Sequence, residues 1–401
     1  MFSYFLPYWR ISYDNSLVQE GVNNLSTRLN WSVKYLLEDG ATLQSQVYFI
    51  KLADGANTTE QVQAIGKLFD VAEVSSIFSN NDFVGIKFHV GEGSNNTRVK
   101  PELISELVSK VKESSGVPFL TETSTLYKGE RHNAVKHLMQ AHRQGFGIEN
   151  VGAPFLMADG LLGNTEYEVA IPGELHKTVN IAREIKGADA LLVVSHATGC
   201  TSTGLGACIK NLGMGLASRK GKRRQHSAVL PTVESSQCTN CTKCMRWCPA
   251  DAIVEQNGKA YIVPEKCIGC GECIAACRFD AVKYDFTADE GYLQKSMAEH
   301  AYGAVIDKPG KCFYFNVMTN MTRNCDCLTK NPDEKLIPDI GILASNDPVA
   351  IDQATQDLTE AAHGHTLGKL AFPHRNSDIQ IKHAAQIGMG SLAYKLIEVE
   401  I

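Results

Sequence analysis

Residues 238–253 read CTNCTKCMRWCPADAI, and residues 267–282 read CIGCGECIAACRFDAV. Each stretch spaces its cysteines as Cys-x2-Cys-x2-Cys-x3-Cys, and the second stretch repeats the first in residue types as well as in spacing. A repeat of this length predicts a small pseudo-symmetric unit built from two similar halves. We therefore delimit a cysteine module at residues 236–286, which interrupts the alternation of β-rich and helix-like segments on either side.

The spacing within the cysteine module is typical of ligands for iron–sulfur clusters. Three thiolates at steps of three residues let one tight loop hold three corners of a [4Fe–4S] cluster, while the fourth cysteine reaches the other cluster. Structural zinc is the alternative, but zinc sites draw their thiolates from two separate pairs, which this spacing fits poorly. We expect two clusters, one held by Cys238, Cys241, Cys244 and Cys277, and the other by Cys267, Cys270, Cys273 and Cys248.

The second half of the module departs from the first after its last cysteine. Arg278 follows Cys277, where the first half has Cys248 followed by proline. One interpretation is that the arginine places a cation beside the first cluster and raises its reduction potential. The other interpretation is a surface arginine paired with Asp280, and the sequence leaves both open.

The composition of the whole chain is that of an ordinary globular protein. It has 401 residues, of which 44% are hydrophobic and 21% charged, with a formal net charge of −5. A length beyond about 250–300 residues predicts more than one folding unit. The mild acidity argues against a protein that coats nucleic acid, so we expect no nucleic-acid partner.

Other features of the chain bear on its compartment. The apolar run at residues 188–194 is far shorter than the roughly 20 residues of a membrane span, so we expect no membrane association. The first residues, MFSYFLPYW, lack the basic start and the small-residue cleavage site of a signal peptide. Thirteen cysteines without a secretion signal indicate metal ligands or catalytic thiols and a cytoplasmic location.

Outside the module, short β-rich runs alternate with helix-like segments. This alternation predicts an α/β fold with a mostly parallel sheet and helices on both faces. The expected strands are 47–52, 83–90, 117–122, 190–196, 312–319 and 340–345. The expected helices are 59–71, 101–114, 133–143, 178–185, 292–302 and 348–362, two of which begin with a proline. We assign residues 46–235 and 287–401 to this α/β body, and residues 1–45 to a peripheral N-terminal extension.

The cysteine motifs resemble those of bacterial two-cluster ferredoxins, which implies a small α+β, ferredoxin-like insertion. The flanks are similar to a narrower family, the Domain of Unknown Function 362. Its iron–sulfur members carry a ferredoxin module in this position, so the resemblance implies a fold and cluster content. It implies no particular reaction. We expect a partner protein that donates or accepts electrons. The similar stretches are HATGCTSTGLGACIKNLGMG (196–215), NCDC (324–327) and ILASNDPVAID (342–352).

Reactive side chains follow several of the expected strands. In open α/β sheets, ligands bind beyond the carboxyl ends of the strands. A proton donor, a carboxylate and a soft ligand beside an electron source are what a reductive reaction requires. We therefore expect one pocket for a small-molecule substrate at this edge. The candidate catalytic residues are His89, Glu122, His196, Cys200, Asp326 and Cys327, and Lys87, Cys325 and Asp347 also fall at strand ends.

Each of these residues also has a purely structural interpretation. His89 and His196 are then satisfied structural histidines, and Asp347, which precedes a proline, caps a helix. Cys200 and Cys208 are then small buried apolar residues.

Two further stretches are ambiguous in the same way. The glycines at 199, 204 and 206 complete neither a dinucleotide fingerprint nor a P-loop, which leaves a loop that opens a helix. Its free amides could hold an anion, with Lys210 and Asn211 nearby. The basic residues between 219 and 224 suit a solvated loop or, alternatively, the docking of an acidic partner or an anionic ligand.

The triplet Cys325-Asp326-Cys327 is the most unusual feature outside the module. Two thiols one residue apart point to opposite sides of an extended chain, but a turn brings them together. With Cys200 or His196 they would complete a third metal site, or they would form a redox dithiol. The remaining alternative is a pair of thiols with no chemical role.

The sequence supports three classes of function. The first is an iron–sulfur electron-transfer protein whose two clusters exchange electrons with a partner, as in a simple carrier. The second is an iron–sulfur oxidoreductase, in which the clusters feed electrons to a substrate at the strand ends. The third is a scaffold for cluster assembly, with Cys325 and Cys327 as transient ligands. The large α/β body suggests a task beyond carrying electrons.

Overall fold

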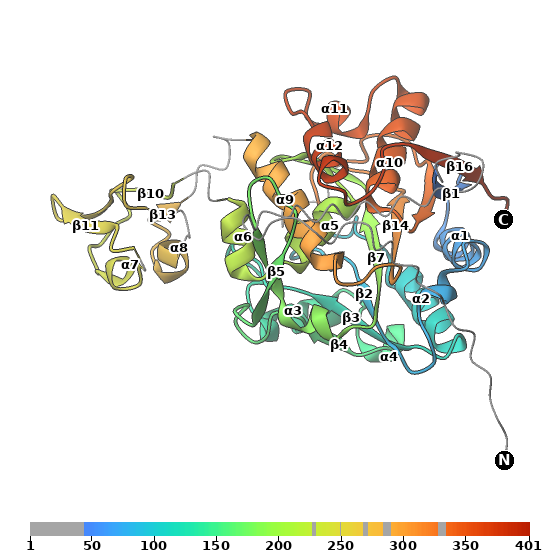
Figure 1. Ribbon diagram of the computed structural model, residues 1–401, viewed down its shortest axis with the longest axis horizontal. Coiled ribbons are helices and arrows are strands. Elements are labelled where there is room, and N and C mark those ends of the chain that lie inside the picture. Colours follow the sequence, from blue (N-terminus) through green and yellow to red (C-terminus); the bar gives the residue numbers. More distant parts are fainter. Residues whose placement is uncertain (1–43, 227–229, 249, 268–271, 284–289, 328–333) are drawn as a thin grey trace, which may run out of the picture. The chain divides into compact units, whose positions relative to one another are not determined.

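The computed structural model describes residues 44–401 except 227–229, 249, 268–271, 284–289 and 328–333. Residues 1–43 of the predicted extension and the predicted ligand Cys270 therefore lie outside the described residues. Within them, eight strands form one large sheet at the centre of the α/β body (Figure 1). Their order across the sheet is β16 (Tyr394–Glu398), β1 (Ser45–Lys51), β15 (Gly341–Ser345), β14 (Cys312–Met318), β7 (Ala190–His196), β2 (Phe83–Lys87), β3 (Val117–Glu122) and β4 (Phe155–Met157).

Strand direction decides which residues meet at the edge of this sheet. β15 is antiparallel to both neighbours, β1 and β14. Every other adjacent pair in the sheet is parallel. The carboxyl ends of β2, β3, β7 and β14 therefore lie along one edge, and the carboxyl end of β15 lies along the opposite edge.

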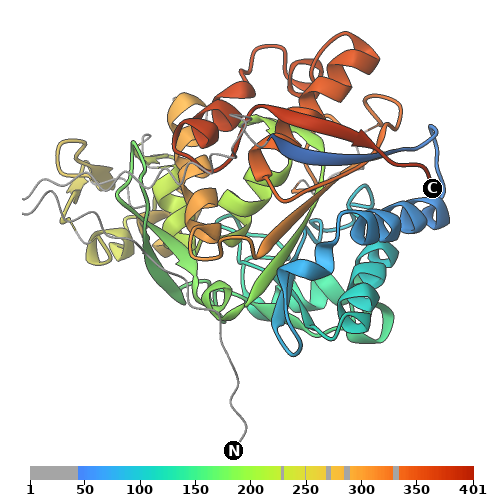
Figure 2. The ribbon, with the colours of Figure 1, turned by 45° about the vertical axis from the view of Figure 1, so that its right-hand side comes forward.

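The sheet is covered on both faces, as the sequence predicts. All seven residues of β7 are buried, and residues 190–194 alternate between two separate hydrophobic cores. Leu191 and Val193 join the core that includes residues of α5 (Cys208–Leu216), α9 (Glu290–Val305), α10 (Pro348–His363) and α12 (Asp378–Gln386). Leu192 and Val194 join the core formed with α1 (Thr58–Val71) and α2 (Pro101–Glu113) (Figure 2). The α/β fold class is confirmed.

Local signals place the helices that pack on this sheet. α1 begins with a capping box, in which Asn57 accepts from the Glu60 amide and Glu60 accepts from the Asn57 amide. α10 begins at Pro348, and Asp347 Oδ1 accepts from the amides of Val349 (2.8 Å) and Ala350 (3.0 Å). Because Asp347 follows the reversed strand β15, its prediction as a residue of the strand-end pocket is wrong, and the capping interpretation is confirmed.

One predicted helix is a strand. Residues 178–185 form β6 (Thr178–Ala182), which pairs antiparallel with β5 (Glu166–Ala170), and then the 3₁₀ turn η3 (Arg183–Gly187). Thr178, Val179 and Ile181 are β-branched, and such side chains pack well on a pleated surface. The cross-strand partner in β5 decided the conformation, and the sequence window by itself carried no sign of that partner.

The remaining elements of the α/β body are short, and no helix in the described ranges is long and apolar enough to cross a bilayer. The basic stretch at 219–224 is helical and partly buried, so its prediction as a solvated loop is wrong. The short remaining elements of the α/β body are η2 (Val74–Ile77), α3 (Ala134–Arg143), α4 (Ile148–Val151), β8 (Thr198–Cys200), β9 (Gly204–Gly206), α6 (Arg219–Gln225) and α11 (Leu367–Ala371).

The cysteine module has its own small sheets and its own core. Two antiparallel pairs, β10 with β13 and β11 with β12, flank two short helices. Its core contains Cys238, Cys244 and Cys273 beside Ile253, Ile262 and Val282, and no residue of the two larger cores belongs to it. The elements are β10 (Thr232–Val233), α7 (Lys243–Arg246), β11 (Ile253–Gln256), β12 (Lys259–Ile262), α8 (Glu272–Ala276) and β13 (Val282–Lys283).

Candidate functional site

A cavity in the cysteine module is lined by four of the predicted cluster ligands. Its volume is about 330 Å³ with its open mouth included, and its wall contains Cys238, Cys241, Cys244 and Cys277. The first three come from the first half of the repeat and Cys277 comes from the second. This is the crossed set that the spacing predicts for one cluster.

The sulfur atoms around this cavity sit in a setting that suits iron–sulfur ligation. Burial raises the pKa of the Cys244 thiol, and the neighbouring Cys238, Cys241 and Cys277 raise it further. The Ala260 amide lies 3.4 Å from Cys238 Sγ as a donor. Amide donors of this kind stabilise the negative charge that sulfur carries in a cluster. These four cysteines and their surroundings therefore fit a [4Fe–4S] cluster.

Three members of the second predicted set are described, and they border the same small core. Cys273 lies in the module core, and Cys248 and Cys267 pack against it. The Ala252 amide donates to Cys248 Sγ at 3.2 Å. Because the fourth member, Cys270, lies outside the described residues, ligation of a second cluster stays a prediction.

In the α/β body, the carboxyl edge of the sheet collects charged side chains from separate strands. Lys87 ends β2 and Glu122 ends β3, and their Nζ and Oε1 atoms lie 3.3 Å apart in the interior. His196 ends β7, and its Nδ1 atom lies 2.8 Å from Oδ2 of Asp326, which follows β14. These side chains form two buried ion pairs, and the catalytic roles predicted for Glu122, His196 and Asp326 stay a prediction.

Glu122 is the centre of the first pair. Its Oε2 atom lies 2.7 Å from His137 Nε2 and 3.5 Å from Arg131 Nη1. Burial raises the pKa of the Glu122 carboxyl, but the charge of Lys87 and the contact with His137 together hold it well below its usual value. Burial lowers the pKa of Lys87, yet its ammonium donates to three acceptors, so we assign it the charged form. These acceptors are Phe88 O (2.8 Å), Asn211 Oδ1 (2.6 Å) and Glu122.

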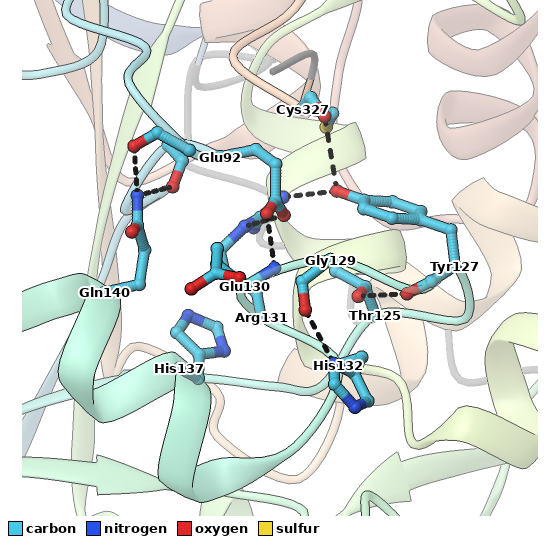
Figure 3. A network of polar contacts seen from close by, with 12 residues as sticks. Glu92, Thr125, Tyr127, Gly129, Glu130, Arg131, His132, His137, Gln140 and Cys327 are labelled. Carbon is cyan, nitrogen blue, oxygen red and sulfur yellow. Dashed lines mark hydrogen bonds and ion pairs between the residues drawn. The ribbon is translucent and has the colours of Figure 1, made fainter.

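Arg131 extends this network towards the surface (Figure 3). Its Nε atom donates to Glu92 Oε2 at 3.1 Å, and its Nη2 atom donates to the hydroxyl of Tyr127 at 2.5 Å. That hydroxyl donates in turn to the carbonyl of Cys327 at 3.4 Å. Tyr127 is exposed, so the chain of contacts runs from the buried carboxylate of Glu122 to the protein surface beside Cys327.

The second ion pair fixes the protonation of His196. Its Nδ1 atom faces the Asp326 carboxylate, and its Nε2 atom lies 3.0 Å from the Thr319 carbonyl. Both neighbours are acceptors, so the ring carries a proton on each nitrogen. Burial lowers the pKa of His196, but the charge of Asp326 and the hydrogen bond to it raise it above the ordinary value. Thr97 also donates to Asp326, at 2.6 Å.

This pair predicts pH-dependent stability. Below the ordinary histidine pKa of 6.5, the full contribution of the pair to the free energy of unfolding is present. This contribution is lost as the pH rises through the raised folded pKa of His196. The pKa of Asp326 is lowered from 3.8 by His196, although burial opposes this, so that contribution is lost as the pH falls through the folded value. Asp326→Asn should therefore destabilise the protein more at about pH 5.5 than at about pH 9 in urea unfolding followed by far-UV circular dichroism. An equal destabilisation at both pH values would contradict the assignment.

Three thiols meet beside these pairs: Cys200 at the end of β8, and Cys325 and Cys327 in the loop after β14. Cys325 shares hydrogen bonds with both Cys200 and Cys327. The bond from Cys325, together with the charges of Lys210 and Arg131, lowers the pKa of Cys327 to about 6 although burial opposes it. The bond with Cys325 and burial both raise the pKa of Cys200. Cys327 is therefore the acceptor, and the thiols donate in the order Cys200 to Cys325 to Cys327.

Two nitrogen donors complete this three-thiol group. His89 Nε2 lies 3.3 Å from Cys327 Sγ, and the Gly91 amide donates to His89 Nδ1 at 3.0 Å. Burial and the charge of Arg131 lower the pKa of His89 to about 3, so the ring is neutral and carries its proton on Nε2. Lys210 shares a hydrogen bond with Cys325. His89, Lys210, Cys325 and Cys327 are all half-buried, whereas Cys200 is buried.

The structure thus brings together His89, Glu122, His196, Cys200, Asp326 and Cys327 along one edge. No group of three or more metal-ligating side chains in a metal-holding arrangement occurs within the described ranges, and a third metal stays a prediction. Cys208 lies elsewhere, in the core, where its amide donates to Asp352. Sequence reasoning missed Glu92, Tyr127, Arg131 and His137. They lie in loops and a helix after strands β2 and β3, where no motif marks them.

Known proteins resemble both the α/β body and the cysteine module of this chain. A model of the family described as Domain of unknown function (DUF362) matches residues 84–357. The chain belongs to the DUF362 family. The predicted family membership is confirmed, and the matched range contains both the cysteine module and the strand-end residues.

Shorter matches connect this DUF362 protein with ferredoxins. It is 39% identical to the protein named Ferredoxin 7Fe of Hydrogenibacillus schlegelii over 61 residues, covering 14% of this chain and 78% of that protein. It is 30% identical to a ferredoxin of Mycolicibacterium smegmatis over 67 residues, or 17% and 63% of the two chains. It is 40% identical to the formate dehydrogenase-O iron–sulfur subunit of Escherichia coli over 52 residues, or 12% and 17%.

Solved structures resemble the DUF362 protein only distantly. The lactate racemase apoprotein of Thermoanaerobacterium thermosaccharolyticum has 10% identity and a TM-score of 0.36, covering 70% of this chain and 51% of that chain. A Thermotoga maritima protein has 10% identity and a TM-score of 0.37, covering 84% and 60%. This chain therefore spans about half to three-fifths of these structures, and the fold assignment rests on the sheet described above.

Proposed function

We propose that this DUF362 protein is an iron–sulfur electron-transfer protein that binds two [4Fe–4S] clusters and supplies electrons to a reductive site at the strand ends of its α/β body. The observation that carries the proposal is the cavity lined by Cys238, Cys241, Cys244 and Cys277. Four thiols from both halves of a repeat around one cavity are the ligand set of a crossed two-cluster module. The similarity to ferredoxins supports the same conclusion.

The residues of the module define what they would hold. Cys238, Cys241, Cys244 and Cys277 would ligate one cluster, and Cys248, Cys267, Cys270 and Cys273 the other. A bound [4Fe–4S] cluster supplies one-electron transfer at low potential. The amide donors at Ala252 and Ala260 offset charge on the cysteine sulfurs, and the buried Ile253, Ile262 and Val282 exclude water from them.

The strand-end residues favour an oxidoreductase over a simple carrier. An electron carrier has no need for a thiolate, two buried ion pairs and a neutral imidazole at the edge of a second domain. The three-thiol group would equally suit a scaffold on which clusters assemble, which is the second candidate function. In either case the electron donor would be a partner protein, and a reducing compartment such as the cytoplasm would keep the thiols available.

Iron and sulfide content tests the proposal. Protein purified without oxygen should contain about eight iron and about eight acid-labile sulfide per chain, because the module offers eight cysteine ligands. It should also show the broad visible absorbance of such clusters. About four iron per chain, or zinc in its place, would contradict the two-cluster assignment.

A further inference from the structure

The three-thiol group can do more than accept electrons. Its central member, Cys325, shares a hydrogen bond with a thiol on each side and with Lys210. Its outer member, Cys327, lies 3.3 Å from the Nε2 proton of His89 and is half-buried, so solvent reaches it. The group therefore presents one accessible sulfur, Cys327, with a second sulfur, Cys325, hydrogen-bonded to it.

We propose that Cys327 and Cys325 form a thiol–disulfide exchange site that reduces a low-molecular-weight disulfide, with Cys327 as the nucleophile and Cys325 as the resolving thiol. The inference rests on the proposed function, which supplies the electrons. It names the substrate class of the reductive site at the strand ends. A small disulfide is favoured over a protein disulfide because the attacking sulfur is only partly exposed.

The surroundings of Cys327 suit it to the first attack. The thiolate is the attacking form in disulfide exchange. Four neighbours stabilise that form: the Cys325 thiol, the Nε2 proton of His89, and the cations Lys210 and Arg131. Arg131 is fixed by Glu92, Glu122 and Tyr127, so its charge stays in place.

The exchange balances in atoms and electrons. Cys327 thiolate attacks one sulfur of the disulfide RS–SR′, forming a mixed disulfide with RS and releasing R′S⁻. Cys325 then attacks Cys327 Sγ, the bond to RS breaks, and the thiol proton of Cys325 leaves with RS as RSH. The product is a Cys325–Cys327 disulfide. Two electrons and one proton restore the Cys325 thiol and the Cys327 thiolate. The reductant is the cysteine module of the proposed function, which would give one electron at a time and act twice.

The contacts favour this chemistry over a third metal site. The Nε2 proton of His89 and the ammonium of Lys210 already face the sulfur atoms that a metal would need. A divalent ion would add its charge beside Lys210 and Arg131, where a single thiolate instead offsets them. Cys200, whose thiol donates to Cys325, acts as a positioning residue that favours the thiolate of Cys325 during the second attack.

The test traps the mixed disulfide on the full-length protein. Wild type and the variants Cys325→Ser, Cys325→Ala and Cys327→Ser are incubated without oxygen with glutathione disulfide, and peptides are mapped by mass spectrometry. Both Cys325 variants should retain one glutathione on Cys327. Wild type should show the Cys325–Cys327 disulfide in its place, and Cys327→Ser should show neither product.

A matched control and the iron content separate the possible outcomes. Cys312→Ala changes a buried cysteine in β14 that belongs to neither the module nor the three-thiol group, and it should behave as wild type. The proposal would be overturned if Cys325 of Cys327→Ser were glutathionylated as fast as Cys327 of wild type. A fall in iron content in any variant at position 325 or 327 would also overturn it. So would faster reduction of a folded protein disulfide than of glutathione disulfide. Exchange in a chain that holds no iron would refute the proposed function and leave this site standing.

Discussion

Replacing Glu122 by glutamine should lower the free energy of unfolding of the α/β body by about 3–5 kcal/mol, the usual cost of removing one partner from a buried ion pair. Glu122 Oε1 faces Lys87 and Oε2 faces His137 and Arg131, and all four side chains are buried. Glutamine has nearly the same shape, so the loss comes from the charge. Lys87 and Arg131 would be left with less compensation in a medium of low dielectric.

An exposed glutamate provides the matched control. Glu130 Oε2 contacts Arg143 at 2.5 Å and its Oε1 contacts Lys136 at 3.7 Å, on the surface of the same region. Glu130→Gln should change the urea midpoint little, because solvent and salt screen exposed pairs. Far-UV circular dichroism in urea measures both variants. Equal shifts for the two variants would show that the buried network contributes no more than a surface contact.

Single and double cysteine variants should separate the two sets of cluster ligands. Cys277→Ser should remove about half of the bound iron, as should Cys241→Ser, because both thiols line one cavity. The double variant of these two should lose no more iron than either single variant. Combining Cys277→Ser with Cys267→Ser should instead remove nearly all the iron, since these thiols are assigned to different clusters.

The cysteine sets also have an uncrossed alternative. If each half of the repeat held its own cluster, Cys277→Ser would add to Cys241→Ser and would not add to Cys267→Ser. Iron and sulfide analysis of protein purified without oxygen distinguishes the two patterns. The crossed pattern is expected because the first three cysteines of one half and the last of the other surround a common cavity.

Much of the α/β body was predictable because its strands are buried on both faces. Strand β7 is apolar from residue 190 to residue 194, and its neighbours β2 and β14 are mostly apolar, which is typical of parallel strands under helices. Strand direction was not predictable from such runs. Strand β15 looks like the others in sequence, yet it runs antiparallel, and this reversal removed Asp347 from the site.

The candidate site was predictable where residues end strands or closely follow them, and where cysteines mark a loop. Lys87, Glu122 and His196 sit at such ends, so the general rule for α/β sheets located them. Arg131 and His137 reach Glu122 from a loop and from α3, after the chain has folded back over the sheet edge. Their roles depend on tertiary contacts that no local pattern encodes.

If the proposed function is right, electrons held by the cysteine module reach the thiols at the strand ends. The most direct measurement mixes anaerobically reduced protein, freed of excess reductant, with glutathione disulfide and follows the visible absorbance of the clusters. Wild type should recover the oxidised spectrum rapidly, with two molecules of glutathione thiol formed for every two electrons lost. Cys327→Ser should recover little at the same iron content. Recovery as fast in Cys327→Ser as in wild type would show that the electrons do not pass through Cys327.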